Sequence, residues 1–96
     1  MSLRQLVPTL ENPYEDGPVE LDCAGFEVLN RGACIVRMSF SGGSAPGLEL
    51  APGEQYRSPV LENLRLQGPL WLRFEEGGSR NVTVIKYTEH NQESFA

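Results

Sequence analysis

The sequence is poor in the residue types that most enzymes and metal sites use. Its 96 residues include one histidine, His90, and two cysteines, Cys23 and Cys34. None of them has the spacing of a zinc site, and a lone histidine in a polar stretch has no nucleophile to activate. We therefore expect no enzyme activity, no catalytic residue, no bound metal and no cofactor.

Basic residues and long apolar runs are also scarce. Lysine occurs once, at Lys86, and the eight basic residues face 13 acidic ones, which leaves a net charge of −5. Binding to a phosphate backbone depends on lysine and arginine, so this balance argues against a nucleic-acid partner. Because no apolar run suits a signal peptide or a membrane span, we expect no membrane contact and folding in the cytosol. Cys23 and Cys34 are then expected to be free, partly buried thiols.

Turn-forming residues, by contrast, are abundant, with ten glycines and seven prolines. They separate short apolar runs at intervals of roughly 8–12 residues, which is typical of an all-β domain. In the best-defined run Leu48 and Leu50 alternate with other residues, and Pro52-Gly53 then has the composition of a type II turn that joins two strands. The pattern predicts a small antiparallel β-sandwich or jelly-roll-like domain of about eight short strands with an extended N-terminal arm.

Two further turns are predicted to close hairpins. Asn30-Arg31-Gly32 joins a run at 26–29 to a run at 33–40, and residues 76–79 lead from a run at 64–74 into a run at 81–88. Alternate apolar side chains in these runs are expected to face the core: Cys34, Val36, Met38 and Phe40; Leu70, Leu72 and Phe74; Val82 and Val84.

The chain divides into an extended arm at 1–18, a β-sandwich domain at 19–88 and a polar C-terminal tail at 89–96. Pro8, Pro13 and Pro18 argue against a regular strand in the arm. His90 falls in the tail, where we expect it to be solvated. The arm nevertheless carries apolar residues that could lie across its own domain or a neighbouring subunit, and these are candidate interface residues: Leu3, Leu6, Leu10 and Tyr14.

Trp71 and Arg73 complete the candidate interface. Both fall on the face opposite Leu70 and Leu72, which is the expected core face. Three interpretations of Trp71 stay open: burial under the N-terminal arm, an anchor in a protein interface, or a platform for stacking a sugar.

The acidic residues near the N-terminus have a weaker functional interpretation. Oxygen ligands suit calcium, but the spacing of these residues is not that of an EF-hand loop. We interpret Glu20 and Asp22 as parts of a solvated strand face. The residues that a calcium site would draw on are Glu11, Glu15, Asp16, Glu20 and Asp22.

Three stretches resemble small β-sandwich virion proteins of tailed bacteriophages, namely capsid decoration (cement) proteins and head–tail or tail accessory proteins. They are Val28-Leu29-Asn30-Arg31-Gly32, Gly47-Leu48-Glu49-Leu50-Ala51-Pro52-Gly53-Glu54 and Leu70-Trp71-Leu72-Arg73-Phe74. The resemblance covers roughly residues 26–87. The turn at 52–53 is also similar to cupin turns, but the metal-binding histidines of cupins have no counterpart here.

The resemblance implies a non-enzymatic virion structural protein, most simply a capsid decoration protein that stabilises the shell through its arm and one face of the sandwich. It implies the major capsid protein or other virion proteins as partners, a homo-oligomer, synthesis in the host cytoplasm and a final place on the capsid surface. Two alternatives stay open. One is a carbohydrate-binding β-sandwich module, and the other is a head–tail connector or tail accessory protein.

Overall fold

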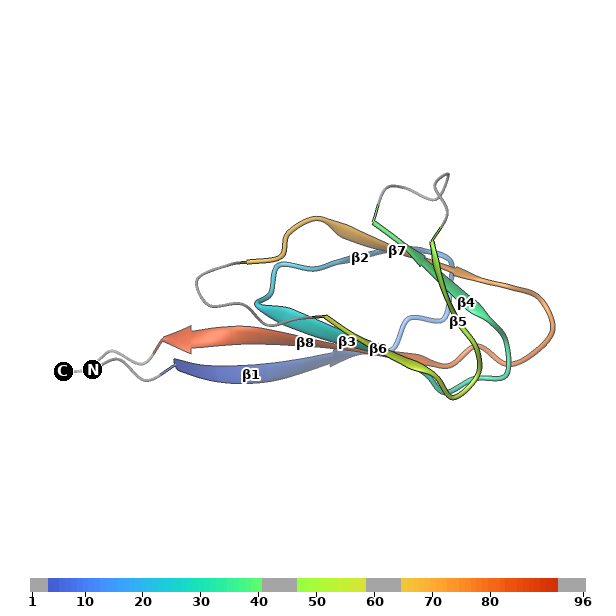
Figure 1. The fold of residues 1–96 in the computed structure, drawn as a ribbon, viewed down its shortest axis with the longest axis horizontal. Coiled ribbons are helices and arrows are strands. Elements are labelled where there is room, and N and C mark those ends of the chain that lie inside the picture. Colours follow the sequence, from blue (N-terminus) through green and yellow to red (C-terminus); the bar gives the residue numbers. More distant parts are fainter. Residues whose placement is uncertain (1–3, 41–46, 59–64, 92–96) are drawn as a thin grey trace.

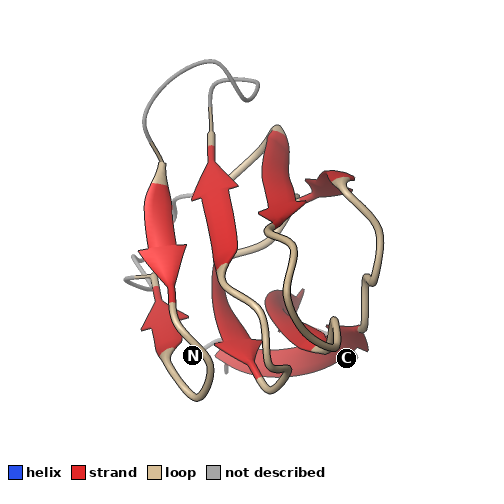
Figure 2. Ribbon diagram, turned by 90° about the vertical axis from the view of Figure 1, so that its right-hand side faces the viewer, coloured by secondary structure: helices blue, strands red, loops and turns tan. Residues whose placement is uncertain are grey.

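The computed structural model describes residues 4–40, 47–58 and 65–91, and the regular structure in these ranges is all strand (Figure 2). Eight strands form two antiparallel four-stranded sheets (Figure 1). Sheet A contains, in spatial order, β1 (Arg4–Glu11), β8 (Val82–Asn91), β3 (Gly25–Asn30) and β6 (Gln55–Arg57). Sheet B contains β2 (Gly17–Glu20), β7 (Pro69–Phe74), β4 (Val36–Ser39) and β5 (Leu48–Leu50). The prediction of a small β-sandwich is confirmed.

Both sheets contribute side chains to one apolar core. The predicted alternation holds in β7 and β8, and each fully buried side chain of this size stabilises the fold by about 1.5–3 kcal/mol. Phe40 departs from the prediction, because it is 55% exposed and meets Phe26 only edge-on, with 6.2 Å between ring centres. The largest buried side chains are Phe26, Val28, Val82 and Val84 from sheet A, and Val36, Met38, Leu70 and Leu72 from sheet B.

The two predicted hairpins, at 30–32 and at 76–79, are wrong, because each of these turns crosses from one sheet to the other, and the turn at 52–53 does so too. β3 and β4, β5 and β6, and β7 and β8 are consecutive in the chain but lie in different sheets. The local chemistry at 52–53 is nevertheless as predicted. Gly53 has a φ of 88°, and the Glu54 amide donates a 3.0 Å hydrogen bond to the Ala51 carbonyl. The turn therefore forms a corner between sheets and sets no register between paired strands.

Asn30 explains why the first of these turns does not close a hairpin. Its side chain is buried, and its Nδ2 donates to the carbonyls of Cys34 at 2.8 Å and Leu50 at 2.9 Å. Its Oδ1 accepts from the Gly32 amide at 3.1 Å. These bonds give backbone groups of the segment that crosses between the sheets their hydrogen-bond partners. In a hairpin, the paired strand would supply such partners within one sheet.

The prediction that the N-terminal arm holds no regular strand is also wrong. β1 runs through Pro8 and pairs with β8 along its whole length, from Arg4 opposite Asn91 to Glu11 opposite Val84. Proline lacks an amide hydrogen, which a central strand needs but an edge strand tolerates, and β1 lies at the edge of sheet A. β8 likewise extends into the predicted tail, where His90 pairs with Gln5.

Candidate interaction surfaces

Trp71 lies on the outer face of sheet B. Register places Pro18 on one side of it and Ser39 on the other, and its neighbours Leu70 and Leu72 point into the core. The Trp71 side chain is half-buried. The face predicted for Trp71 is therefore the one it occupies, and the residue that flanks it from the N-terminal segment is Pro18.

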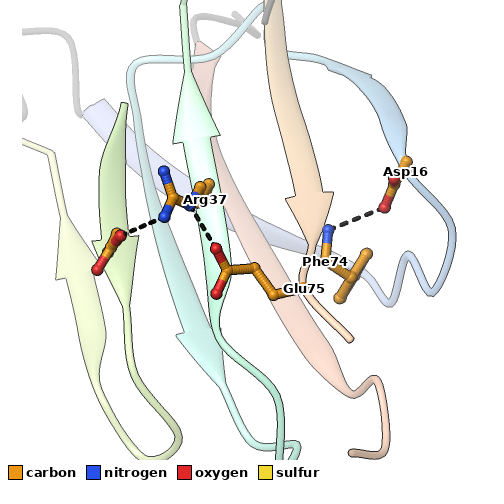
Figure 3. Close-up of polar contacts among 5 residues, drawn as sticks. Asp16, Arg37, Phe74 and Glu75 are labelled. Atoms are coloured by element: carbon orange, nitrogen blue, oxygen red, sulfur yellow. Dashed lines mark hydrogen bonds and ion pairs between the residues drawn. The ribbon is translucent and has the colours of Figure 1, made fainter. Parts of the chain in front are cut away.

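Arg73 shares this outer face and lies directly opposite Arg37 of β4. Like charges in opposite positions destabilise a strand pair, and Arg37 is balanced by two carboxylates. It contacts Glu49 and Glu75 at 2.7 Å each (Figure 3). Within the described ranges no ion pair involves Arg73, which is exposed. Its charge is thus available to an external partner.

An open hollow of about 740 Å³ continues this surface at the end of β7. The Asp16 carboxylate accepts a 2.8 Å hydrogen bond from the Phe74 amide and so fixes the loop before β2 (Figure 3). The Arg80 guanidinium lies 5.3 Å from the centre of the Phe74 ring and donates to the Tyr14 carbonyl at 3.4 Å. Tyr14 itself is 67% exposed. The lining residues are Asp16, Arg37, Arg73, Phe74, Glu75, Glu76 and Arg80.

The outer face of sheet A is unexpectedly apolar. Register places Leu10 opposite Ile85 and Pro8 opposite Tyr87 on this face. Leu6 and Leu10 are 40% and 59% exposed, while Ile85 and Tyr87 are half-buried. Sequence reasoning selected Leu6 and Leu10 but missed the two β8 residues. The signal was present, because both faces of the run at 82–88 carry apolar side chains.

A polar group borders this apolar face on the β3–β6 side. Tyr87 Oη donates to Glu27 Oε2 at 2.8 Å, and Arg57 Nε donates to Glu27 Oε1. The hydrogen bonds from Tyr87 and Arg57 lower the pKa of Glu27, and the same Glu27 bond raises the pKa of Tyr87. A hollow of about 260 Å³ lies here, lined by Leu6, Phe26, Glu27, Arg57, Ser58 and Tyr87.

The two cysteines are free, as predicted, and both are fully buried. Burial raises the pKa of the Cys23 thiol. Two of the residues considered for calcium form ion pairs, Asp22 with Arg65 and Glu11 with Lys86, each at 2.6 Å. In the described part of the chain no group of three or more histidine, cysteine or acidic residues could hold a metal ion. The candidate residue Leu3 lies outside the described ranges.

No protein-family model, curated protein or solved structure matches this chain. The likeness to phage virion proteins therefore rests on the sequence stretches alone, whereas the β-sandwich rests on the structure. None of the described segments forms a helix that is long and apolar enough to cross a membrane.

Proposed function

We propose that the protein is a non-enzymatic structural protein of a tailed-phage virion, and specifically a decoration protein that docks on the major capsid protein. The observation that carries the proposal is the pair Trp71 and Arg73, adjacent on the outer face of sheet B. Tryptophan and arginine are the residues that most often dominate the energy of protein interfaces. Arg73 also lines the hollow at the end of β7. Arg80 lines the same hollow and donates a hydrogen bond to the Tyr14 carbonyl.

The chemistry of this face defines the partner surface. Trp71 offers a flat apolar ring that is only half covered, and Arg73 offers a planar cation with no carboxylate among the described residues. A partner that covers the ring and places a carboxylate or carbonyl oxygen on Arg73 gains both contacts. Arg37 contributes less, since Glu49 and Glu75 already occupy it.

The pairing of β1 changes how the N-terminal segment takes part. Residues 4–11 are committed to sheet A, so the proposed contact with the shell uses a preformed sheet face in place of a free arm. A preformed face loses little conformational entropy on binding. Many copies on one shell then make up for a modest single contact.

The test is co-sedimentation of the full chain with shells assembled from the major capsid protein encoded beside its gene. Trp71→Ala and Arg73→Ala are each expected to weaken binding by about tenfold or more. Arg31→Ala is the matched control, because Arg31 is exposed and lies on the link between β3 and β4. Wild-type chain that stays in the supernatant, or a gene neighbourhood without capsid genes, would overturn the proposal.

The half-exposed ring of Trp71 also favours one alternative, a carbohydrate-binding module. Because Trp71 is the single tryptophan, its fluorescence reports on this face alone. The decoration role predicts no change of emission on titration with oligosaccharides. A saturable shift, together with no binding to shells, would replace it with the carbohydrate role. Sedimentation with isolated portal complexes but not with shells would indicate a connector.

A further inference from the structure

The outer face of sheet A carries exposed apolar side chains and lies on the other side of the sandwich from the Trp71 face. Antiparallel sheets with one solvated side usually alternate apolar residues inward with polar residues outward. β8 departs from this rule, because Val82 and Val84 fill the core while Ile85 and Tyr87 point outward. The apolar outer side chains come from three neighbouring strands: Leu6, Pro8 and Leu10 of β1, Ile85 and Tyr87 of β8, and Leu29 of β3.

The charge on this face identifies the kind of partner that fits it. The ionisable side chains described there, apart from the Tyr87 phenol, are Glu27 and Arg57, and they are bonded to each other. The charges described around Ile85 and Tyr87 therefore cancel, on a chain whose net charge is −5. An identical copy can meet it without placing like charges in contact, whereas a basic partner would be attracted to the acidic surfaces elsewhere.

The β1–β8 ribbon supplies a second argument. The start of β1 and the end of β8 extend beyond the rest of the described sandwich (Figure 1). Val7 lies on the inward side, opposite Thr88, yet 43% of its surface is exposed, so sheet B no longer covers the ribbon there. A two-stranded ribbon is marginally stable in water by itself and gains from packing on another surface.

We propose that two copies of the chain pack face to face through the outer faces of their A sheets. Leu10, Ile85 and Tyr87 form the apolar centre of each half, and the Glu27–Arg57 pair lies directly beside it, with Glu27 opposite Ile85. The contact is isologous, with the same patch on both copies. It leaves both Trp71 faces free and does not depend on the virion role.

Sedimentation equilibrium of the full chain over a concentration series tests this proposal. The expected result is a dimer with twice the 10.6 kDa chain mass. Leu10→Asp is expected to weaken the dimer at least tenfold, because it buries a charge at the centre of the contact. Leu48→Asp is the matched control, since Leu48 is also an exposed leucine on an edge strand, 49% exposed on β5 of sheet B. It is expected to leave the dimer unchanged.

Circular dichroism of both variants shows whether they fold, and amide exchange of the wild-type chain gives an independent measurement. Exchange in β1 and β8 is expected to slow as the concentration rises. A wild-type monomer at all concentrations would overturn the proposal, and so would a dimer that resists Leu10→Asp. Trp71→Ala separates the two proposals, because it is expected to weaken binding to shells by about tenfold or more while the dimer persists.

Discussion

The Asn30 side-chain amide donates a 2.9 Å hydrogen bond to the Leu50 carbonyl, and this bond joins β3 of sheet A to β5 of sheet B. The backbone of Asn30 adds to the link, because its carbonyl accepts from the Gly53 amide at 2.8 Å and its amide donates to Glu54 at 3.0 Å. One buried residue thus holds two of the sheet-to-sheet links together.

Asn30→Ala is expected to destabilise the domain by about 2–4 kcal/mol, since it leaves the buried carbonyls of Cys34 and Leu50 without their donor. That is a large share of the total for a domain of this size. Urea unfolding followed by circular dichroism measures the change. Asn81→Ala, at an exposed asparagine, is the matched control and should shift stability by less than about 0.5 kcal/mol. Equal effects of the two variants would contradict the role of Asn30.

Gly32→Ala tests the close contact between the β3–β4 and β7–β8 links. A Cβ on Gly32 would lie 2.3 Å from the Ser79 carbonyl oxygen and 2.7 Å from the Asn81 nitrogen. The links must move apart, and we expect a cost of about 1–3 kcal/mol. Thermal unfolding should show a midpoint lowered by roughly 4–8 °C per kcal/mol. Arg31→Ala keeps the same backbone bonds and should leave the midpoint nearly unchanged, so a similar drop in both variants would argue against the steric explanation.

Tyr87→Phe should change how stability depends on pH. The Glu27 pKa lies below its ordinary value of 4.5, so its contribution is present above pH 4.5 and is lost as the pH falls through the folded-state pKa. The Tyr87 pKa lies above 10.0, so its contribution is present below pH 10 and is lost as the pH rises through the folded-state pKa. The difference in free energy of unfolding between the wild type and Tyr87→Phe should be largest between these two pKa values and shrink outside them.

Urea unfolding of the wild type and Tyr87→Phe across the pH range measures that difference. Tyr14→Phe is the control, because the Tyr14 side chain is exposed and donates no described hydrogen bond. A difference between wild type and Tyr87→Phe that stays constant with pH would show that the Tyr87–Glu27 bond does not contribute to stability.

Cys23 and Cys34 should be unreactive in the folded protein. Both are buried, and burial raises the pKa of Cys23, which lowers the fraction of the reactive thiolate. A thiol reagent such as Ellman's should label neither residue in native buffer and both in urea. A chain that shows no free thiol even when unfolded would mean that the two cysteines had paired.

The sequence predicted the elements that depend on alternation. Leu70, Leu72 and Phe74 had to face the core because an every-second-residue pattern leaves one face apolar, and they do. The sequence did not predict which of the two sheets each strand would join. The Asn30-Arg31-Gly32 turn has hairpin composition, but its direction is decided by the bonds from Asn30 to residues in the other sheet, which local sequence does not encode.

One of the two candidate surfaces could be predicted from the sequence, and the other could not. The outward direction of Trp71 followed from the periodicity of its own strand. The apolar outer face of sheet A needed the strand order, since Leu10 and Ile85 are 75 positions apart and become neighbours only through the β1–β8 pairing. Pro8 concealed this pairing, because the tolerance of an edge strand for proline is visible only once the edge is known.

The place of β8 in sheet A also bears on how the chain acquires its fold during synthesis. β8 lies between β1 and β3, yet the ribosome makes it after every other described strand. Among the described strands only β4 and β5 pair with a neighbour in the chain, and both β1 and the β8-facing edge of β3 stay unpaired until residues 82–91 leave the exit tunnel. Topologies dominated by such distant pairings fold in roughly milliseconds to seconds. A nascent chain that stalls before β8 would therefore expose β1 and that edge of β3 to aggregation.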